Sequence, residues 1–163
     1  MTLFVGIDPG LSGAIAFRRS DDEMDVLPLP VLTITKAKGI RRVLDLTALA
    51  NILDDKTKSA TGARVFIEHV SAMPKQGVAS MFAFGETYGA IKGIVAAHFL
   101  PMTLITPVMW KAKLKVSKNK DDARYRASQL MPRFAHLWSR RSEDGLAEAA
   151  MIAFYGQHHG DTA

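Results

Sequence analysis

Short apolar runs bounded by turn residues dominate the first part of the chain. Their β-branched composition predicts strands at about 2–8, 12–19 and 23–28, and the glycines and proline within 9–13 predict the turn between the first two. A later apolar run predicts another strand at about 63–69. The three early strands follow one another closely, which indicates a meander.

Apolar residues at helical spacing predict helices in the remainder of the chain. We expect them at about 45–57, between the loop at 74–77 and His98, and at about 107–113, 120–131 and 143–157. A short strand is expected at 102–105, and residues 36–42 are expected to form a basic loop before the first helix. Strands that alternate with helices predict an α/β fold in which helices flank a mixed five-stranded sheet.

Four carboxylates stand at the edges of these apolar elements. Asp8 ends the first strand, Glu68 ends the strand at 63–69, and Asp144 and Glu148 share one face of the last helix. A buried carboxylate needs a partner that keeps it charged, and a divalent cation is one such partner. An Asp8 that only caps its own turn is the alternative. The set predicts an oxygen-rich site for magnesium or manganese, since the chain has no Cys and its five His lack ligand spacing.

Length and composition limit what such a site can serve. The chain has 163 residues, 48% of them hydrophobic, which predicts one domain over residues 1–158 and a short tail at 159–163. The absence of Cys favours an intracellular, cytoplasmic protein, and neither a signal peptide nor a membrane span is expected. A formal net charge of +5 favours a polyanionic partner.

The positive charge is gathered in clusters around the acidic segments. Residues expected to contact DNA are Lys36, Lys38, Arg41, Arg42, Lys75, Lys111, Lys113, Lys115, Lys118, Lys120, Arg124, Arg140 and Arg141. Such runs are often only solvated surface, but here they surround a group of metal-type carboxylates. Acids that hold cations beside bases that hold phosphates predict a phosphodiesterase that acts on nucleic acid.

Three glycines recur every fourth residue in the long helix, at Gly85, Gly89 and Gly93. Each costs about 1 kcal/mol of helix stability relative to alanine, so the ridge predicts a close contact. The helix packed directly on its own sheet is the first expectation. The helix of a second subunit, or a DNA backbone, is the alternative.

These segments together resemble the RuvC-type Holliday junction resolvases, in particular the compact phage-like branch. The resemblance is carried by the Asp8-Pro9-Gly10 turn, the strand ending at Glu68, the lysine-bearing segment after Thr106 and the last acidic helix, in that order along nearly the whole chain. It implies a ribonuclease-H-like fold, a homodimer, branched DNA as the partner, and magnesium-dependent nicking of four-way junctions. A phage-encoded member would act in the bacterial host cell, in the cytoplasm or at the nucleoid, in recombination, in repair or in debranching.

The resemblance also implies roles for single residues. Two Mg²⁺ ions per site, replaceable by Mn²⁺, would be held by Asp8, Glu68, Asp144 and Glu148. Catalytic lysines near the scissile phosphate would correspond to Lys111 and Lys120.

Two features depart from the family pattern, and each leaves a choice open. The last two acids are four residues apart rather than three, so Glu143 is an alternative to Asp144. An aromatic residue that opens the junction in the bacterial family is replaced by Ser71, for which Met73 is a candidate substitute.

Competing functions remain open on the sequence. Within the nuclease class, a broader branched-DNA endonuclease or a ribonuclease H is the nearest competitor. A catalytically silent nucleic-acid-binding module would keep the basic clusters without needing four convergent acids. An actin-like or sugar-kinase-like ATPase also begins with a similar hairpin, but it needs a second copy of the domain and a longer chain.

Overall fold

The computed structural model describes residues 1–37, 39–71, 77–117 and 119–160. Within them, five strands form one mixed sheet in the order β3-β2-β1-β6-β7. The strands are β1 (Thr2–Ile7), β2 (Ala14–Arg18), β3 (Met24–Pro28), β6 (Gly62–Glu68) and β7 (Met102–Ile105). The expected mixed five-stranded sheet is therefore confirmed.

The described residues also form five α-helices and two short 3₁₀ helices. They are α1 (Leu46–Thr57), α2 (Val78–Ala97), α3 (Pro107–Leu114), α4 (Lys120–Leu130), η1 (Pro132–Trp138), η2 (Arg141–Glu143) and α5 (Asp144–His159). The start of α1 follows from its capping residue, because the Asp45 side chain accepts a hydrogen bond from the Ala48 amide at 2.9 Å. At the other end of the chain α5 runs to His159, so the helix takes in the first residue of the expected tail.

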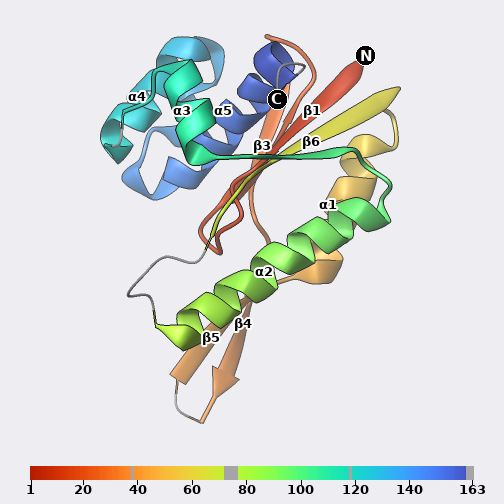
Figure 1. The fold of residues 1–163 in the computed structure, drawn as a ribbon, viewed down its shortest axis with the longest axis vertical. Helices are drawn as coiled ribbons and strands as arrows, with labels where there is room; N and C mark the ends of the chain where they lie inside the picture. The colour runs from red at the N-terminus through yellow and green to blue at the C-terminus, as the bar shows by residue number, and fades with distance from the viewer. Residues whose placement is uncertain (38, 72–76, 118, 161–163) are drawn as a thin grey trace.

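The sheet separates two layers of helices, with α1 and α2 on one face and α3, α4 and α5 on the other (Figure 1). The apolar side chains of β1, β2 and β6 point alternately into these two layers, so each face of the sheet has its own hydrophobic cluster. The helix α5 lies directly on β1, because a Cβ on Gly6 would come within 2.3 Å of the Ala149 carbonyl oxygen. This close approach brings the acids of α5 to the sheet.

Strand direction brings the first two acids together. β1 is antiparallel to β2 and parallel to β6, and Ile7 is paired with Ile67. Asp8 and Glu68 each follow one residue later, so they leave neighbouring strands at the same edge of the sheet. This adjacency of the carboxyl ends positions the candidate site.

The expectation of a basic loop at 36–42 was wrong. The chain there forms an antiparallel hairpin of β4 (Val31–Lys36) and β5 (Gly39–Leu44), in which Gly39 has a φ of +122° at the start of the second strand. Most of the hairpin is exposed on both faces, and its basic residues, together with the short apolar alternation of Leu32 and Ile34, did not mark it as a strand pair in the sequence. The hairpin projects from the body of the protein below α2 (Figure 1).

Candidate active site

A tight loop fixes Asp8 at the end of β1. The Asp8 amide donates to the Ala14 carbonyl at 3.0 Å, which closes the β1–β2 connection. Gly13 is required in this loop, because a Cβ there would lie 2.1 Å from the Asp8 carbonyl oxygen. The Asp8 carboxylate accepts a hydrogen bond from the Gly10 amide, so the turn contributes part of its stabilisation.

Helix α5 brings Glu148 to the same edge of the sheet. A Cβ on Gly145, in the first turn of α5, would lie 3.4 Å from Oδ2 of Asp8. One turn later Glu148 accepts a hydrogen bond from Lys111, with 3.0 Å between Oε1 and Nζ. Lys111 comes from α3, so residues from separate parts of the chain meet beside Asp8.

The charges of these groups act on one another. The pKa of Asp8 is raised from 3.8 to about 7, first by burial and then by the negative charges of Glu148 and Glu68, while the Gly10 amide and Lys111 act in the opposite direction. The pKa of Glu68 is also raised, mainly by burial. Three carboxylates with one neighbouring ammonium group leave the site short of positive charge.

A tryptophan that the sequence analysis did not single out holds Glu68. The indole Nε1 of Trp110 donates to Oε2 of Glu68 at 2.8 Å, and this bond counteracts the rise in the pKa of Glu68. Trp110 stands between Thr106 and Lys111, in a segment already assigned to the site, but a single aromatic residue in an apolar helix gives no signal of a polar contact.

Asp144 and Glu143 have other partners at the start of α5. Asp144 forms an ion pair with Arg124, with 2.7 Å between Oδ1 and Nε at an angle that does not make a hydrogen bond. Arg124, expected to contact DNA, also pairs with Asp121. Glu143 accepts from the backbone amide of Arg140 at 2.7 Å and so closes the η2 turn.

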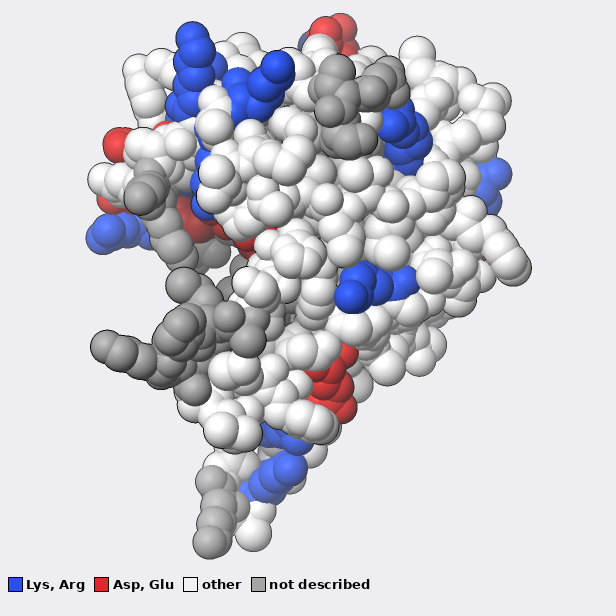
Figure 2. Space-filling view, in the orientation of Figure 1, with Lys and Arg blue, Asp and Glu red and all other residues white. Residues whose placement is uncertain are grey.

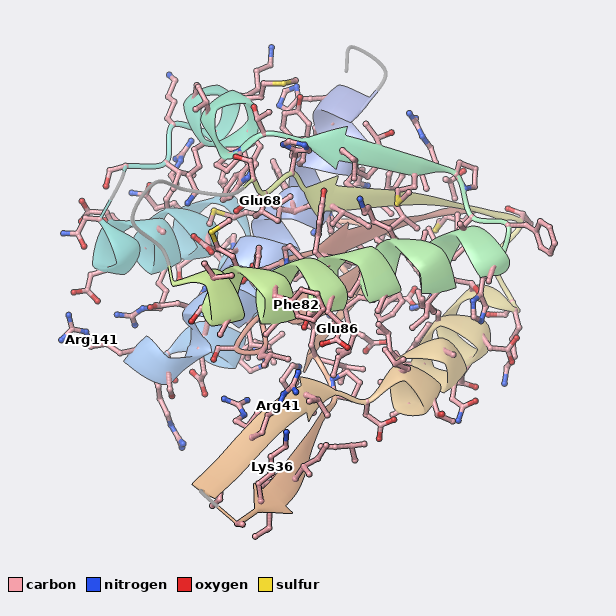
Figure 3. All side chains as sticks on the ribbon, turned by 60° about the horizontal axis from the view of Figure 1, so that its bottom comes forward. Lys36, Arg41, Glu68, Phe82, Glu86 and Arg141 are labelled. Atoms are coloured by element: carbon pink, nitrogen blue, oxygen red, sulfur yellow. The ribbon has the colours of Figure 1, made fainter. Side chains whose placement is uncertain are left out.

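The described candidate DNA-binding residues lie on the β4–β5 hairpin, on α3, on α4 and around η2. Lys36, Arg41 and Arg42 lie on the β4–β5 hairpin, where Arg41 pairs with Glu86 of α2 at 3.2 Å (Figure 3). Arg42 donates to the carbonyl oxygen of Leu11 at 3.0 Å, which ties the hairpin to the loop that carries Asp8.

The other exposed basic residues come from α3 and from the segment around η2, which lie apart, because Lys113 of α3 is near His159 at the C-terminal end of α5 while η2 precedes its first residue. Lys113, Lys115, Arg140 and Arg141 are exposed there. Basic side chains are visible both over α3 and α4 and over the hairpin, with acidic atoms in the hollow between them (Figure 2). Lys38, Lys75, Met73 and Lys118 lie outside the described residues, and of Lys120 only the backbone, at the start of α4, is described.

The donor set fits a hard divalent cation. Among the described residues no three acidic or histidine side chains converge as a ready coordination shell. Asp8, Glu68 and Glu148 nevertheless offer carboxylate oxygens whose negative charges repel one another, and a bound cation would relieve this repulsion. Lys111 already makes one such contact to Glu148, with a single positive charge.

Comparison with known proteins identifies the fold. No family model and no curated protein sequence matches the chain. Among solved structures, RuvC of Thermus thermophilus aligns with 95% of this chain and 95% of its own length, at 17% identity and a TM-score of 0.53. T. thermophilus RuvC in complex with a Holliday junction substrate aligns with 98% of this chain and 97% of its own, at 15% identity and a TM-score of 0.57.

These alignments define a RuvC-like, ribonuclease-H-like fold over almost the whole chain. The resemblance to RuvC that the sequence predicted is thereby confirmed at the level of the fold. None of the helices in the described part of the chain is both long and apolar enough to cross a membrane.

Proposed function

We propose that this protein is a metal-dependent, structure-selective endonuclease that nicks four-way DNA junctions. The observation that carries the proposal is that Glu68 and Glu148 lie near enough to Asp8, at one end of the sheet, for their charges to help burial raise the pKa of Asp8 to about 7. The RuvC-like fold supports the same function, because one of the matching structures is a RuvC bound to a Holliday junction.

The reaction class follows from the donor set. Two bound Mg²⁺ ions, or Mn²⁺ in their place, would supply charge stabilisation and an activated water for hydrolysis of a phosphodiester. Asp8, Glu68 and Glu148 would hold them, and Asp144 would join after leaving Arg124. Lys111 would leave Glu148 and place its ammonium group against the phosphate as negative charge grows there. Lys120 is proposed for the same role.

Basic side chains would hold the arms of the junction. They are visible over α3 and α4 and over the hairpin, with acidic atoms in the hollow between them, so DNA that reaches the acids would meet basic groups on both sides (Figure 2). Phosphate contacts position the backbone without reading its sequence, which suits recognition of a branched shape.

We also propose a homodimer formed through α2. A Cβ on Gly85, Gly89 or Gly93 would meet no other atom within 4 Å, so the expectation that this ridge packs on its own sheet was wrong. Val78 and Phe82 extend the same helix face and are 86% and 74% exposed. A second copy of α2 would cover this apolar face, and two active sites would then nick two strands of a symmetric junction.

A substrate panel tests the proposed function. The protein is incubated with a four-way junction, a three-way junction, an RNA–DNA hybrid and plain duplex, with Mg²⁺ or with EDTA. We expect Mg²⁺-dependent nicks in the four-way junction, and their loss in Asp8→Asn and Glu68→Gln with binding retained. Asp54→Asn, at an exposed acid of α1, is the matched control. Preferred cleavage of the hybrid would indicate a ribonuclease H, equal cleavage of both junctions a broader branched-DNA endonuclease, and binding without cleavage a silent module.

A further inference from the structure

Helix α3 begins beside Glu68 because of how the sheet ends. Glu68, the last residue of β6, is paired with Ile105, the last residue of β7. Thr106 then caps α3 by accepting a hydrogen bond from the Met109 amide at 3.2 Å, and Pro107 occupies the first turn. The first turn of α3 is therefore fixed next to the Glu68 carboxylate.

Trp110 is held rigidly at the end of this turn. Its side chain has 0% exposure and packs in the cluster that includes Ile105, Leu114 and Met151. A fully buried indole cannot change rotamer without disturbing this packing. Its one polar atom, Nε1, points at Oε2 of Glu68 at 2.8 Å.

The hydrogen bond distinguishes the two oxygens of the carboxylate. Indole N–H is a donor only, so it binds Glu68 as an acceptor and fixes the plane of the carboxyl group. Oε2 accepts the hydrogen bond from Trp110, which leaves Oε1 available to a second donor or to a cation. Donors behind a ligating group orient it in this way in metal sites generally.

We propose that Trp110 is a positioning residue, which orients Glu68 so that Oε1 is directed to the metal ion. This inference rests on the proposed function, since it assigns Glu68 to a metal. It adds a requirement that the acids alone do not impose, namely that a buried indole N–H stands behind one of them.

The chain contains its own matched control. Its two tryptophans are Trp110 and Trp138, and Trp138 is 1% exposed with its Nε1 donating to Oγ of Ser128 at 3.0 Å. Removing the indole N–H at either position costs one buried hydrogen bond, but only Trp110 reaches an acid of the candidate site.

The test replaces Trp110 with 3-benzothienylalanine, which keeps the ring shape and substitutes sulfur for N–H. Trp110→Phe is made in parallel, and Trp138→Phe serves as the control. The readout is the Mn²⁺ concentration that gives half of the maximal thermal stabilisation, which does not depend on cleavage. In Trp138→Phe, Trp110 is the only tryptophan, so quenching of its fluorescence by paramagnetic Mn²⁺ gives a second measure of binding.

We expect the benzothienylalanine protein to need about ten- to a hundredfold more Mn²⁺ than the wild type. Trp138→Phe is expected to keep the wild-type requirement, with Trp110 quenched. An unchanged Mn²⁺ requirement in the benzothienylalanine protein would overturn the role of Trp110 while leaving the metal site intact. An equal loss in Trp138→Phe would overturn it too, because the effect would then be one of general stability. A wild-type protein that Mn²⁺ neither stabilises nor quenches would overturn both the metal site and this inference.

Discussion

Replacing Asp8 by Asn is expected to make the metal-free protein more stable while it abolishes the proposed cleavage. Burial and two neighbouring carboxylates raise the pKa of Asp8 from 3.8 to about 7 in the folded protein. Between these values the folded state binds more protons than the unfolded state, so the free energy of unfolding falls as the pH rises. The loss of stability caused by ionised Asp8 is fully present above about pH 7 and disappears below about pH 4.

The size of the effect follows from the difference between the two pKa values. A difference of about 3 pH units at about 1.4 kcal/mol per unit gives a ceiling of about 4 kcal/mol at pH 8. Relaxation of the site and entry of water reduce that ceiling, and we expect Asp8→Asn to gain about 2 kcal/mol, or about 5 °C in melting temperature. Asn keeps the size of the side chain and an oxygen for the Gly10 amide, so only the charge is removed.

Urea unfolding in EDTA at pH 5, 6, 7 and 8 measures this gain. The stability difference between the variant and the wild type is expected to grow across the series, while the exposed control Asp54→Asn shows no such trend. Addition of Mg²⁺ is expected to stabilise the wild type more than Asp8→Asn, because only the wild type keeps the charge that the ion neutralises. If Asp8→Asn is no more stable than the wild type at pH 8, the electrostatic account of the site is incorrect.

The remaining predictions concern the fourth acid, the helix face and the hairpin. Asp144→Asn should lower Mg²⁺-dependent junction cleavage at least about tenfold with binding retained, whereas undiminished cleavage would remove Asp144 from the site. Phe82→Asp should shift sedimentation from dimer to monomer. Phe99→Asp, at a 92% exposed position beyond the other end of α2, should leave the dimer intact. A wild-type protein that is monomeric at micromolar concentration would contradict the dimer. Lys36→Ala should lower the slope of log affinity against log salt by about 0.9 on duplex arms, and an unchanged slope would place the hairpin away from DNA.

The sequence predicted the sheet and most helices because these elements bury apolar residues in continuous runs or at regular spacing. The strands that carry Asp8 and Glu68 were recognised from apolar runs that the structure shows to be buried on both faces. The hairpin of β4 and β5 was missed because it is a mostly exposed ribbon with no buried face to impose a period. The spacing of apolar residues thus indicates which elements are buried, and an exposed element is hard to recognise from it.

The candidate site could be assembled from the sequence only as far as strand ends predict adjacency. The sequence placed Asp8 and Glu68 at the ends of two apolar strands, and the structure brings them together because β1 and β6 are parallel neighbours. The pairing of Glu68 with Trp110 could not be predicted, because it joins side chains 42 residues apart through a contact that depends on how α3 packs. The same is true of Arg124, which sequence grouped with DNA-binding residues and the structure pairs with Asp144.

The four acids of the proposed site differ in the kind of partner that each has in the metal-free protein. Glu148 is paired with Lys111 and Asp144 with Arg124, whereas Glu68 has the neutral indole of Trp110 and Asp8 is stabilised chiefly by a backbone amide. The two acids on α5 thus have cationic partners that a metal would have to displace. The two on the sheet have neutral donors that can stay in place when an ion binds. In the proposed site the sheet acids would therefore be the fixed part and the α5 acids the part that exchanges partners, and Lys111 would become available for the phosphate if Glu148 held the ion.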